Sequence, residues 1–126
     1  MNIFFDVDHT LIDSSNRLRP GVLDLFARLT QAGHALYLWS GIGARPEVVE
    51  QHGLGAYVRA CYVKPLYQHR RMLAPLGIGV NPDFVVDDHP DLVAVFGGMV
   101  VQRFLVYDAA DREMERVYAV IADVAR

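Results

Sequence analysis

The chain of 126 residues has little of what marks secreted or membrane-spanning proteins. It has a single cysteine, Cys61, so no disulfide can form within the chain. No apolar run approaches the roughly 18 residues that cross a membrane. The N-terminus lacks the basic start of a signal peptide and carries Asp6 and Asp8 where the apolar core of such a peptide would lie. We therefore expect a cytoplasmic protein that does not interact with membranes.

Basic residues are also too scattered to form a nucleic-acid-binding stripe. The net charge is −3, and the arginines form only short groups, such as those at 17–19 and 70–71. No nucleic-acid surface is therefore predicted. What the chain does have is a hydrophobic fraction of 52% beside 21% charged residues, the composition of a folded domain. The apolar excess also leaves room for a homo-oligomer.

Short apolar runs alternate with helical patterns along the chain. The first, second and fourth runs are almost wholly apolar, as expected of strands that are buried on both faces of a parallel sheet. The third run contains Cys61, which we expect to be a small buried hydrophobic residue. Strands are predicted at 3–7, 35–39, 57–63, 84–86 and 99–101, with a further short piece at 104–107.

Helices are predicted between these strands from apolar residues at helical spacing, in the first and the last of them, and from the glycine or proline that bounds the others. Helices are predicted around 22–29 before the capping residue Gly33, at 46–52, at 66–74 before Pro75, from Pro90, and from about Asp111 to the C-terminus. Strands that alternate with helices indicate an α/β fold. We expect one domain over residues 1–126, a three-layer α/β/α sandwich around a Rossmann-like parallel sheet of about five strands.

Polar residues follow the apolar strands in a repeated way. Asp6 and Asp8 end the first strand, Ser40 ends the second, Lys64 follows the third, and the acidic pair 87–88 ends the fourth. In open parallel sheets, ligands bind beyond the carboxyl ends of the strands. The sequence therefore predicts that carboxylates, a hydroxyl and an ammonium group meet at one edge of the sheet.

This combination of groups suits a metal ion and a phosphoryl group. Asp6 and Asp8 point the same way because side chains alternate along a strand. Together with Asp87 and Asp88 they would repel one another, and a hard divalent cation removes that repulsion. Mg²⁺ takes oxygen ligands and commonly binds carboxylates together with a substrate phosphate. We therefore predict a Mg²⁺ site formed by Asp6, Asp8, Asp87 and Asp88.

Four short motifs occur in the order typical of one enzyme superfamily. They are DVDHT at 6–10, LWSG at 38–41, VKP at 63–65 and VVDDHPD at 85–91. In this order, each on a predicted strand end, they resemble the motifs of the haloacid dehalogenase-like (HAD) superfamily. The resemblance extends from residue 3 to about residue 91. It implies a HAD-like fold for the single domain.

The resemblance also implies a role for each motif residue. Asp6 would be the nucleophile that forms an aspartyl-phosphate, and Asp8 the general acid that then acts as a base. Because the dehalogenases of the family lack an acid at this position, Asp8 favours a phosphatase or a phosphotransferase. Ser40 and Lys64 would hold the phosphoryl oxygens. The implied Mg²⁺ ligands are Asp6, the backbone carbonyl of Asp8, Asp87 and, directly or through water, Asp88.

The intervals between the motifs leave no room for the cap domain that many family members carry. Only residues 13–19 separate the first motif from the first helix, and one helix and one strand fill 41–63. We therefore expect a capless phosphatase with an open site, acting on a phosphorylated small molecule or macromolecule. Capless relatives act on small molecules when a neighbouring subunit covers the site. The residues predicted to contact the substrate are Gly41, Arg45, His69 and Arg70.

Two other function classes stay open. Signalling receiver domains also have an acidic cluster, Mg²⁺, a phospho-accepting Asp and a Lys, but their acidic pair follows the first strand and their Lys the last. A catalytically quiet domain that binds a phosphorylated ligand or a partner would use the same residues, although the complete motif set argues against it. Asp91 fits the start of a helix after Pro90, and His89 receives no role.

Overall fold

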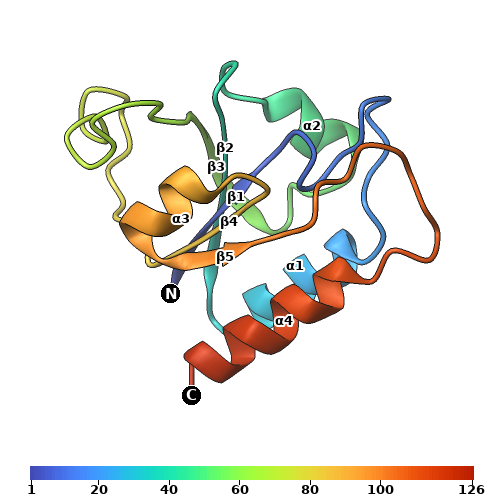
Figure 1. Ribbon diagram of the computed structural model, residues 1–126. Coiled ribbons are helices and arrows are strands. Elements are labelled where there is room, and N and C mark those ends of the chain that lie inside the picture. Colours follow the sequence, from blue (N-terminus) through green and yellow to red (C-terminus); the bar gives the residue numbers. More distant parts are fainter.

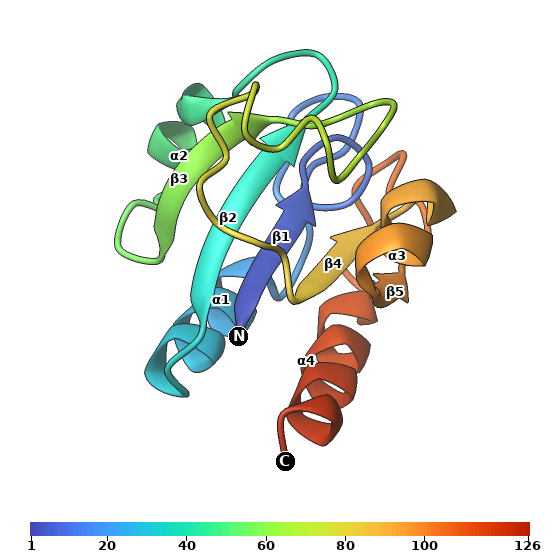
Figure 2. The same ribbon diagram turned by 90° about the vertical axis from the view of Figure 1, so that its left-hand side faces the viewer.

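A five-stranded parallel sheet forms the centre of the protein in the computed structural model, which describes residues 1–126 (Figures 1 and 2). Its strands run in the spatial order β3-β2-β1-β4-β5, and every neighbouring pair is parallel. The predicted α/β fold is confirmed. The strands are β1 (Asn2–Asp6), β2 (Ala35–Ser40), β3 (Val58–Val63), β4 (Phe84–Asp87) and β5 (Gly98–Val100).

The three most apolar strands occupy the middle of the sheet. β1, β2 and β4 are almost entirely buried, whereas β3 and β5 lie at the edges and are partly exposed. Cys61 is accordingly half-buried rather than buried, because it lies on an edge strand. The strand order reverses between β1 and β4, the kind of position at which open α/β sheets bind ligands.

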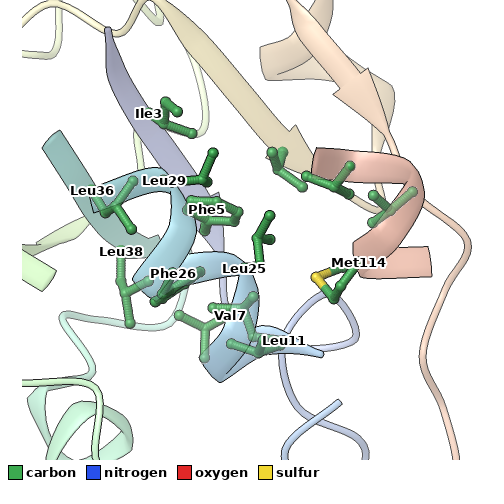
Figure 3. Close-up of a cluster of buried hydrophobic side chains, with 14 of the residues drawn as sticks. Ile3, Phe5, Val7, Leu11, Leu25, Phe26, Leu29, Leu36, Leu38 and Met114 are labelled. Carbon is green, nitrogen blue, oxygen red and sulfur yellow. The ribbon is translucent and has the colours of Figure 1, made fainter. Parts of the chain in front are cut away.

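Three of the four helices pack on one face of the sheet and the fourth on the other (Figure 1). On the first face, Ile3 and Phe5 of β1 pack with Phe26 and Leu29 of α1 (Figure 3). Burial of each such side chain contributes about 1.5–3 kcal/mol. The first face is covered by α1 (Val22–Gln31), α2 (Pro46–Gln51) and α4 (Glu113–Val124), and the second by α3 (Pro90–Phe96).

On the second face, α3 shares the cover with a segment that has no regular structure. Ile78 of this segment packs with Phe4, Trp39 and Phe96. The predicted helix at 66–74 is wrong, because this stretch consists of turns with isolated helical hydrogen bonds, such as Met72 N–H to the Gln68 carbonyl.

One backbone angle shows where the predicted helix is interrupted. Gln68 has a φ of 46°, in the left-handed region that an α-helix excludes. The further strand predicted at 104–107 is also wrong, since this segment is irregular and its N–H groups bond outside the sheet, as Phe104 does to the His9 carbonyl.

No additional domain interrupts the sheet. A loop alone joins β1 to α1, and α2 is the only helix between β2 and β3. The expectation of a capless fold is therefore confirmed. None of the helices is long and apolar enough to cross a membrane.

Candidate functional site

The ends of four strands bring the predicted site residues to one edge of the sheet. Asp6 is the last residue of β1, Ser40 of β2 and Asp87 of β4, and Lys64 directly follows β3. Figure 2 shows the loops after β1, β2 and β3 gathered above the strand ends. The apolar strands thus place these polar side chains where the sheet core ends.

Lys64 lies between two of the predicted carboxylates. Its Nζ donates to Asp6 Oδ1 at 2.8 Å and to Asp87 Oδ2 at 3.1 Å. All three side chains are largely withdrawn from solvent, with 13%, 8% and 2% of the Lys64, Asp6 and Asp87 side chains exposed. Charge-assisted hydrogen bonds with so little water around them hold the ammonium firmly in place.

Three carboxylates form a cluster that fits a hard divalent cation. One oxygen from each of Asp6, Asp87 and Asp88 lies within 4.8 Å of the others. Carboxylate oxygens at such spacing are the ligands that Mg²⁺ takes, with water completing its coordination. The Asp8 side chain is not part of this cluster. Any contribution of Asp8 to a metal site would have to come from its backbone carbonyl, as the family resemblance implies.

Thr10 connects two members of the cluster. Its Oγ1 lies 3.1 Å from Asp6 Oδ2 and 3.3 Å from Asp88 Oδ1, so that its hydroxyl proton can serve either carboxylate. The same oxygen accepts the Asp88 backbone N–H at 3.1 Å. The chain reaches this position through His9, whose φ of 62° turns the loop sharply after Asp8.

The charge balance of the cluster favours protonation of Asp6. Burial, followed by the charge of Asp87, raises the pKa of Asp6 from 3.8 to about 7, although Lys64 acts in the opposite direction. Burial likewise raises the pKa of Asp87, and Lys64 only partly offsets this. Without a cation, the carboxylates therefore compete for one ammonium group.

The pKa values of Asp88 and Lys64 shift in the direction that keeps both side chains charged. Burial acts to raise the pKa of Asp88, but hydrogen bonds with Asp6, Asp87 and Thr10 outweigh it and lower the pKa. Burial acts to lower the pKa of Lys64, yet the charges and hydrogen bonds of Asp6 and Asp87 raise it. Lys64 is therefore a permanent cation in this site.

The Asp8 side chain lies outside the cluster and binds Arg45 instead. Arg45 Nη1 donates to Asp8 Oδ2 at 2.6 Å, and Arg45 Nε donates to Glu47 at 2.7 Å. The Asp8 side chain is 38% exposed, whereas that of Arg45 is 17% exposed. The loop after β2 is thereby tied to the loop after β1, and the predicted acid–base residue lies beside the predicted substrate contact Arg45.

Ser40 ends β2, and the residues after it form a turn. The Ser40 hydroxyl oxygen accepts the Ile42 N–H at 3.3 Å, and the Ser40 carbonyl accepts the Lys64 N–H at 2.9 Å. Gly41 lies against Leu66, because a Cβ at Gly41 would stand 3.1 Å from Leu66 Cδ2. The Ser40 side chain thus shapes its own loop, and its predicted contact with a phosphoryl oxygen stays a prediction.

His69 and Arg70 have different surroundings although they are neighbours in sequence. His69 lines a pocket of about 240 Å³ whose other lining residues include Lys64 and Asp87. Arg70 is not in the lining of this pocket; its Nη2 donates to the Val95 carbonyl at 2.7 Å. The structure therefore brings His69 close to the site and engages Arg70 with α3.

His89 and Asp91 begin the helix that follows the fourth motif. His89 is the N-cap residue of α3, and its Nδ1 accepts the Asp91 N–H at 3.4 Å. The predicted place of Asp91 in the first turn of a helix is confirmed. Both side chains also line the pocket beside Lys64.

Two arginines near the site were not found from the sequence. Arg103 Nε lies 3.4 Å from Asp88 Oδ2, and its Nη2 lies 3.4 Å from His9 Nδ1. Arg19 is fully buried, pairs twice with Asp111 at 3.0 Å, and donates to the Thr10 carbonyl at 3.2 Å. No local pattern marks either residue, because segments far apart in the sequence bring them here.

Comparison with known proteins finds no family model that matches this chain and no curated protein with a matching sequence. The resemblance to the HAD superfamily therefore depends on the four motifs and on the geometry around them. The strand order agrees with the 3-2-1-4-5 order of Rossmann folds and differs from the 2-1-3-4-5 order of flavodoxin-like folds. Receiver domains have the second order, so the strand order argues against that alternative.

Proposed function

We propose that this protein is a capless, Mg²⁺-dependent phosphomonoesterase of the HAD type. The observation that carries the proposal is the placement of Lys64 between Asp6 and Asp87, with Asp88 completing a three-carboxylate cluster. Carboxylates with one fixed ammonium beside them suit a site that binds a metal ion and a phosphoryl group together. The cytoplasmic location expected from the sequence belongs to this proposal.

In the proposed reaction, Asp6 attacks the phosphorus atom in line with the ester oxygen that leaves. A bond forms between the Asp6 carboxylate oxygen and phosphorus, the bond from phosphorus to the ester oxygen breaks, and Asp8 gives its proton to the departing alkoxide. Water then attacks the phosphorus of the aspartyl-phosphate, the bond to Asp6 breaks, and Asp8 takes up the proton of the water. Inorganic phosphate and the alcohol are the products.

The other residues of the site hold the reacting groups in place. Lys64 would keep its ammonium against the phosphoryl oxygens, and Ser40 would donate its hydroxyl to one of them. Thr10 fixes the carboxylates of Asp6 and Asp88 relative to each other. The residues that would hold Mg²⁺ are Asp6, Asp87 and Asp88 with the Asp8 carbonyl, and the ion would neutralise charge on the phosphoryl group.

Asp8 must leave Arg45 or share it during this reaction. The Asp8–Arg45 pair is part of an open edge of the site, and 38% of the Asp8 side chain is accessible to solvent. To act as the acid, the Asp8 side chain would have to rotate toward the bound ester and give up or share its ion pair with Arg45, whose side chain is 17% exposed.

The test is hydrolysis of p-nitrophenyl phosphate by the purified protein with Mg²⁺ and with EDTA. Turnover that requires Mg²⁺ and disappears in Asp6→Asn supports the proposal. Asp24→Asn is a matched control, because Asp24 is an exposed residue of α1 that only approaches Arg28. Turnover that survives in Asp6→Asn would refute the role of Asp6, and would point to a contaminating phosphatase or to another mechanism.

The second candidate is a catalytically quiet domain that binds a phosphorylated ligand or a partner. The observation that favours it is the 2.6 Å pair between Arg45 and Asp8, which occupies the predicted acid–base residue. Such a domain would bind phosphate analogues without turnover. Mg²⁺-dependent trapping of BeF₃⁻ or AlF₄⁻ on Asp6, with turnover of the aryl phosphate, would favour the enzyme. Binding of inorganic phosphate without trapping or turnover would favour the quiet domain.

A further inference from the structure

We propose that Arg19, held in place by Asp111, is a positioning residue for the proposed Mg²⁺ site and acts by fixing the loop after β1. The inference rests on the metal site of the proposed function and adds two residues that lie outside the four motifs. Arg19 forms no hydrogen bond with the three clustered carboxylates. Its effect on the site would therefore be exerted through the backbone of this loop.

Three successive carbonyl groups of the loop are bonded by residues outside it. Arg19 takes two of them, because its backbone N–H donates to the Leu11 carbonyl at 2.7 Å and its Nη1 donates to the Thr10 carbonyl at 3.2 Å. The Phe104 N–H donates to the His9 carbonyl at 2.8 Å. Buried backbone groups that have partners on both sides leave a loop little freedom to move.

The Asp8 carbonyl is the exception in this loop. The carbonyls of Val7 and Ile12 accept N–H groups of the loop itself, whereas the Asp8 carbonyl accepts no hydrogen bond from any group of the protein. A carbonyl oxygen without a donor is a suitable ligand for a hard cation. The bonds to residues 9–11 thus hold the loop in a conformation that leaves free the carbonyl which the resemblance assigns to Mg²⁺.

Thr10 connects the loop to the carboxylates. Arg19 holds its backbone carbonyl, and its Oγ1 lies 3.1 Å from Asp6 Oδ2 and 3.3 Å from Asp88 Oδ1. Thr10 and Arg19 are both fully buried, so that water does not readily replace a lost bond between them. A displacement of the Thr10 backbone would therefore move the hydroxyl that orients two of the three carboxylates.

Asp111 fixes the Arg19 guanidinium from a distant part of the chain. Its two carboxylate oxygens accept Arg19 Nε and Nη2, each at 3.0 Å, and the guanidinium lies 4.9 Å from the centroid of the Phe104 ring. Asp111 Oδ1 also accepts the Glu113 N–H at 3.1 Å, which ties the carboxylate to the start of α4. Because the guanidinium is planar, a bidentate partner on one edge sets the direction of the remaining N–H groups.

The experiment measures Mg²⁺ binding to Asp111→Asn by isothermal titration calorimetry. Asparagine keeps one oxygen for the Glu113 N–H, but it loses the charge and the second acceptor that orient Arg19. Loss of a residue that orients metal ligands typically lowers metal affinity about 10- to 100-fold, and since Arg19 acts one step further away we expect the Kd for Mg²⁺ to rise about five-fold. Circular dichroism establishes that the variant is folded during the titration.

A second variant keeps the test decisive if Asp111→Asn does not fold, because that change leaves the buried Arg19 without its counter-charge. Arg19→Met combined with Asp111→Asn removes both charges, and the replacement of a buried ion pair by neutral residues is often tolerated. The combined variant also lacks the donor to the Thr10 carbonyl. Its Kd for Mg²⁺ should therefore rise by about the same factor as in Asp111→Asn.

Matched controls separate positioning from a general loss of stability. Ile121→Val and Ile121→Ala remove atoms from a fully buried residue in the last turn of α4 and leave the loop after β1 intact. Both lower stability through the core, and they should keep the wild-type Kd for Mg²⁺. In Asp111→Asn, saturating Mg²⁺ should restore kcat for p-nitrophenyl phosphate to within about two-fold of wild type, because the ion then holds its ligands in place.

The outcomes separate this inference from the proposed function. If the wild type binds Mg²⁺ and shows Asp6-dependent hydrolysis, but both Asp111 variants keep its Kd, the inference is overturned and the phosphatase stands. An equal rise in Kd in the Ile121 variants, or a loss of kcat that Mg²⁺ does not restore, also overturns it. If the wild type binds Mg²⁺ without hydrolysing any ester, the phosphatase fails and the Kd values still decide the inference. If the wild type binds no Mg²⁺, both fail.

Discussion

Lys64 sets the electrostatics of the site at the scale of single residues. One ammonium serves Asp6 and Asp87, while Asp88 has only the more exposed Arg103 as its cationic neighbour. The cluster therefore carries more negative charge than its fixed cations neutralise. Burial of unneutralised carboxylates is unfavourable, so the residues that suit metal binding also reduce the stability of the metal-free protein.

Asp6→Asn is predicted to stabilise the metal-free protein at neutral pH. The pKa of Asp6 is raised from 3.8 to about 7, so the folded state binds more protons than the unfolded state across this window. The free energy of unfolding contributed by Asp6 therefore falls as pH rises from about 4 to about 7. The amide carries no charge to bury, and Tm in EDTA at pH 7.5 should rise by roughly 3–5 °C.

The control for this prediction is the same pair of proteins at about pH 4.5, where Asp6 is protonated in the folded state. There the difference in Tm between Asp6→Asn and wild type should be small. A variant that is less stable than wild type at pH 7.5 in EDTA would contradict the prediction. It would mean that the hydrogen bond from Lys64 contributes more stability than the buried charge removes.

Thr10→Val is predicted to weaken Mg²⁺ binding. Valine has the shape of threonine but cannot bond to Asp6 or Asp88, and it cannot accept the Asp88 N–H. Loss of a group that orients metal ligands typically reduces affinity about 10- to 100-fold. Isothermal titration calorimetry measures the effect, and Thr10→Ser, which keeps the hydroxyl, should retain most of the affinity. Equal affinity in wild type and Thr10→Val would contradict the role of Thr10.

At the scale of secondary structure elements, apolar runs predicted the sheet well. The runs at 3–7, 35–39 and 84–86 were expected to be buried on both faces, and they form the three central strands β1, β2 and β4. Such strands are recognisable because burial on both faces requires an uninterrupted apolar stretch. Their ends were predictable for the same reason, which placed Asp6, Ser40 and the acidic pair 87–88 correctly.

The elements that were mispredicted are those whose state depends on distant contacts or on single backbone angles. The stretch 66–74 was expected to be a helix that ends at Pro75, but Gln68 adopts a left-handed φ that no local pattern indicates. The segment 104–107 is apolar, yet it binds the loop after β1, as in the bond from Ser14 N–H to the Leu105 carbonyl. Arg19 could not be assigned from the sequence because it packs on Phe104 of this segment. Arg103 could not be assigned because its partners, Asp88 and His9, are distant in sequence.

Gly98→Ala is predicted to disrupt the edge strand β5. The φ of Gly98 is 141°, and a Cβ at this position would lie 1.9 Å from the Val85 carbonyl oxygen of β4. The backbone would have to move, with a cost of about 3 kcal/mol or more in unfolding free energy. Gly55→Ala is the matched control, since Gly55 has no positive φ and no atom near the added Cβ, and it should change stability by less than about 0.5 kcal/mol.

Urea denaturation measures both glycine variants. A Gly98→Ala protein as stable as Gly55→Ala would contradict the prediction. It would show that β5 can separate from β4 without lowering the free energy of unfolding. The comparison also reports on the site, because β5 leads directly to Arg103, the cationic neighbour of Asp88. We expect Gly98→Ala to reduce turnover as well, because displacement of β5 would move Arg103 away from Asp88.

At the scale of the whole molecule, the site connects parts of the chain that are far apart in sequence. Asp6, Lys64 and Asp88 are brought together by three strands, and Arg103 joins them from the segment after the last strand. The unfolded chain does not hold these groups together. A cation that binds the cluster therefore binds the folded state alone, and it stabilises the fold by mass action.

Mg²⁺ is predicted to raise Tm more at about pH 8 than at about pH 6. A metal ligand must be deprotonated, and the Asp6 carboxyl, with a pKa of about 7, is mostly protonated one unit below that value and mostly ionised one unit above it. The apparent affinity should therefore increase up to about tenfold between the two conditions, and the metal-induced stabilisation by up to about 1.4 kcal/mol at Mg²⁺ concentrations well above both dissociation constants. Differential scanning calorimetry measures the shift, with NaCl of equal ionic strength as the control for screening.

In Asp6→Asn the shift should be smaller and should no longer depend on pH in this range. Equal shifts at both pH values in the wild type would mean that a cation does not displace the proton of Asp6, and would remove Asp6 from the metal site.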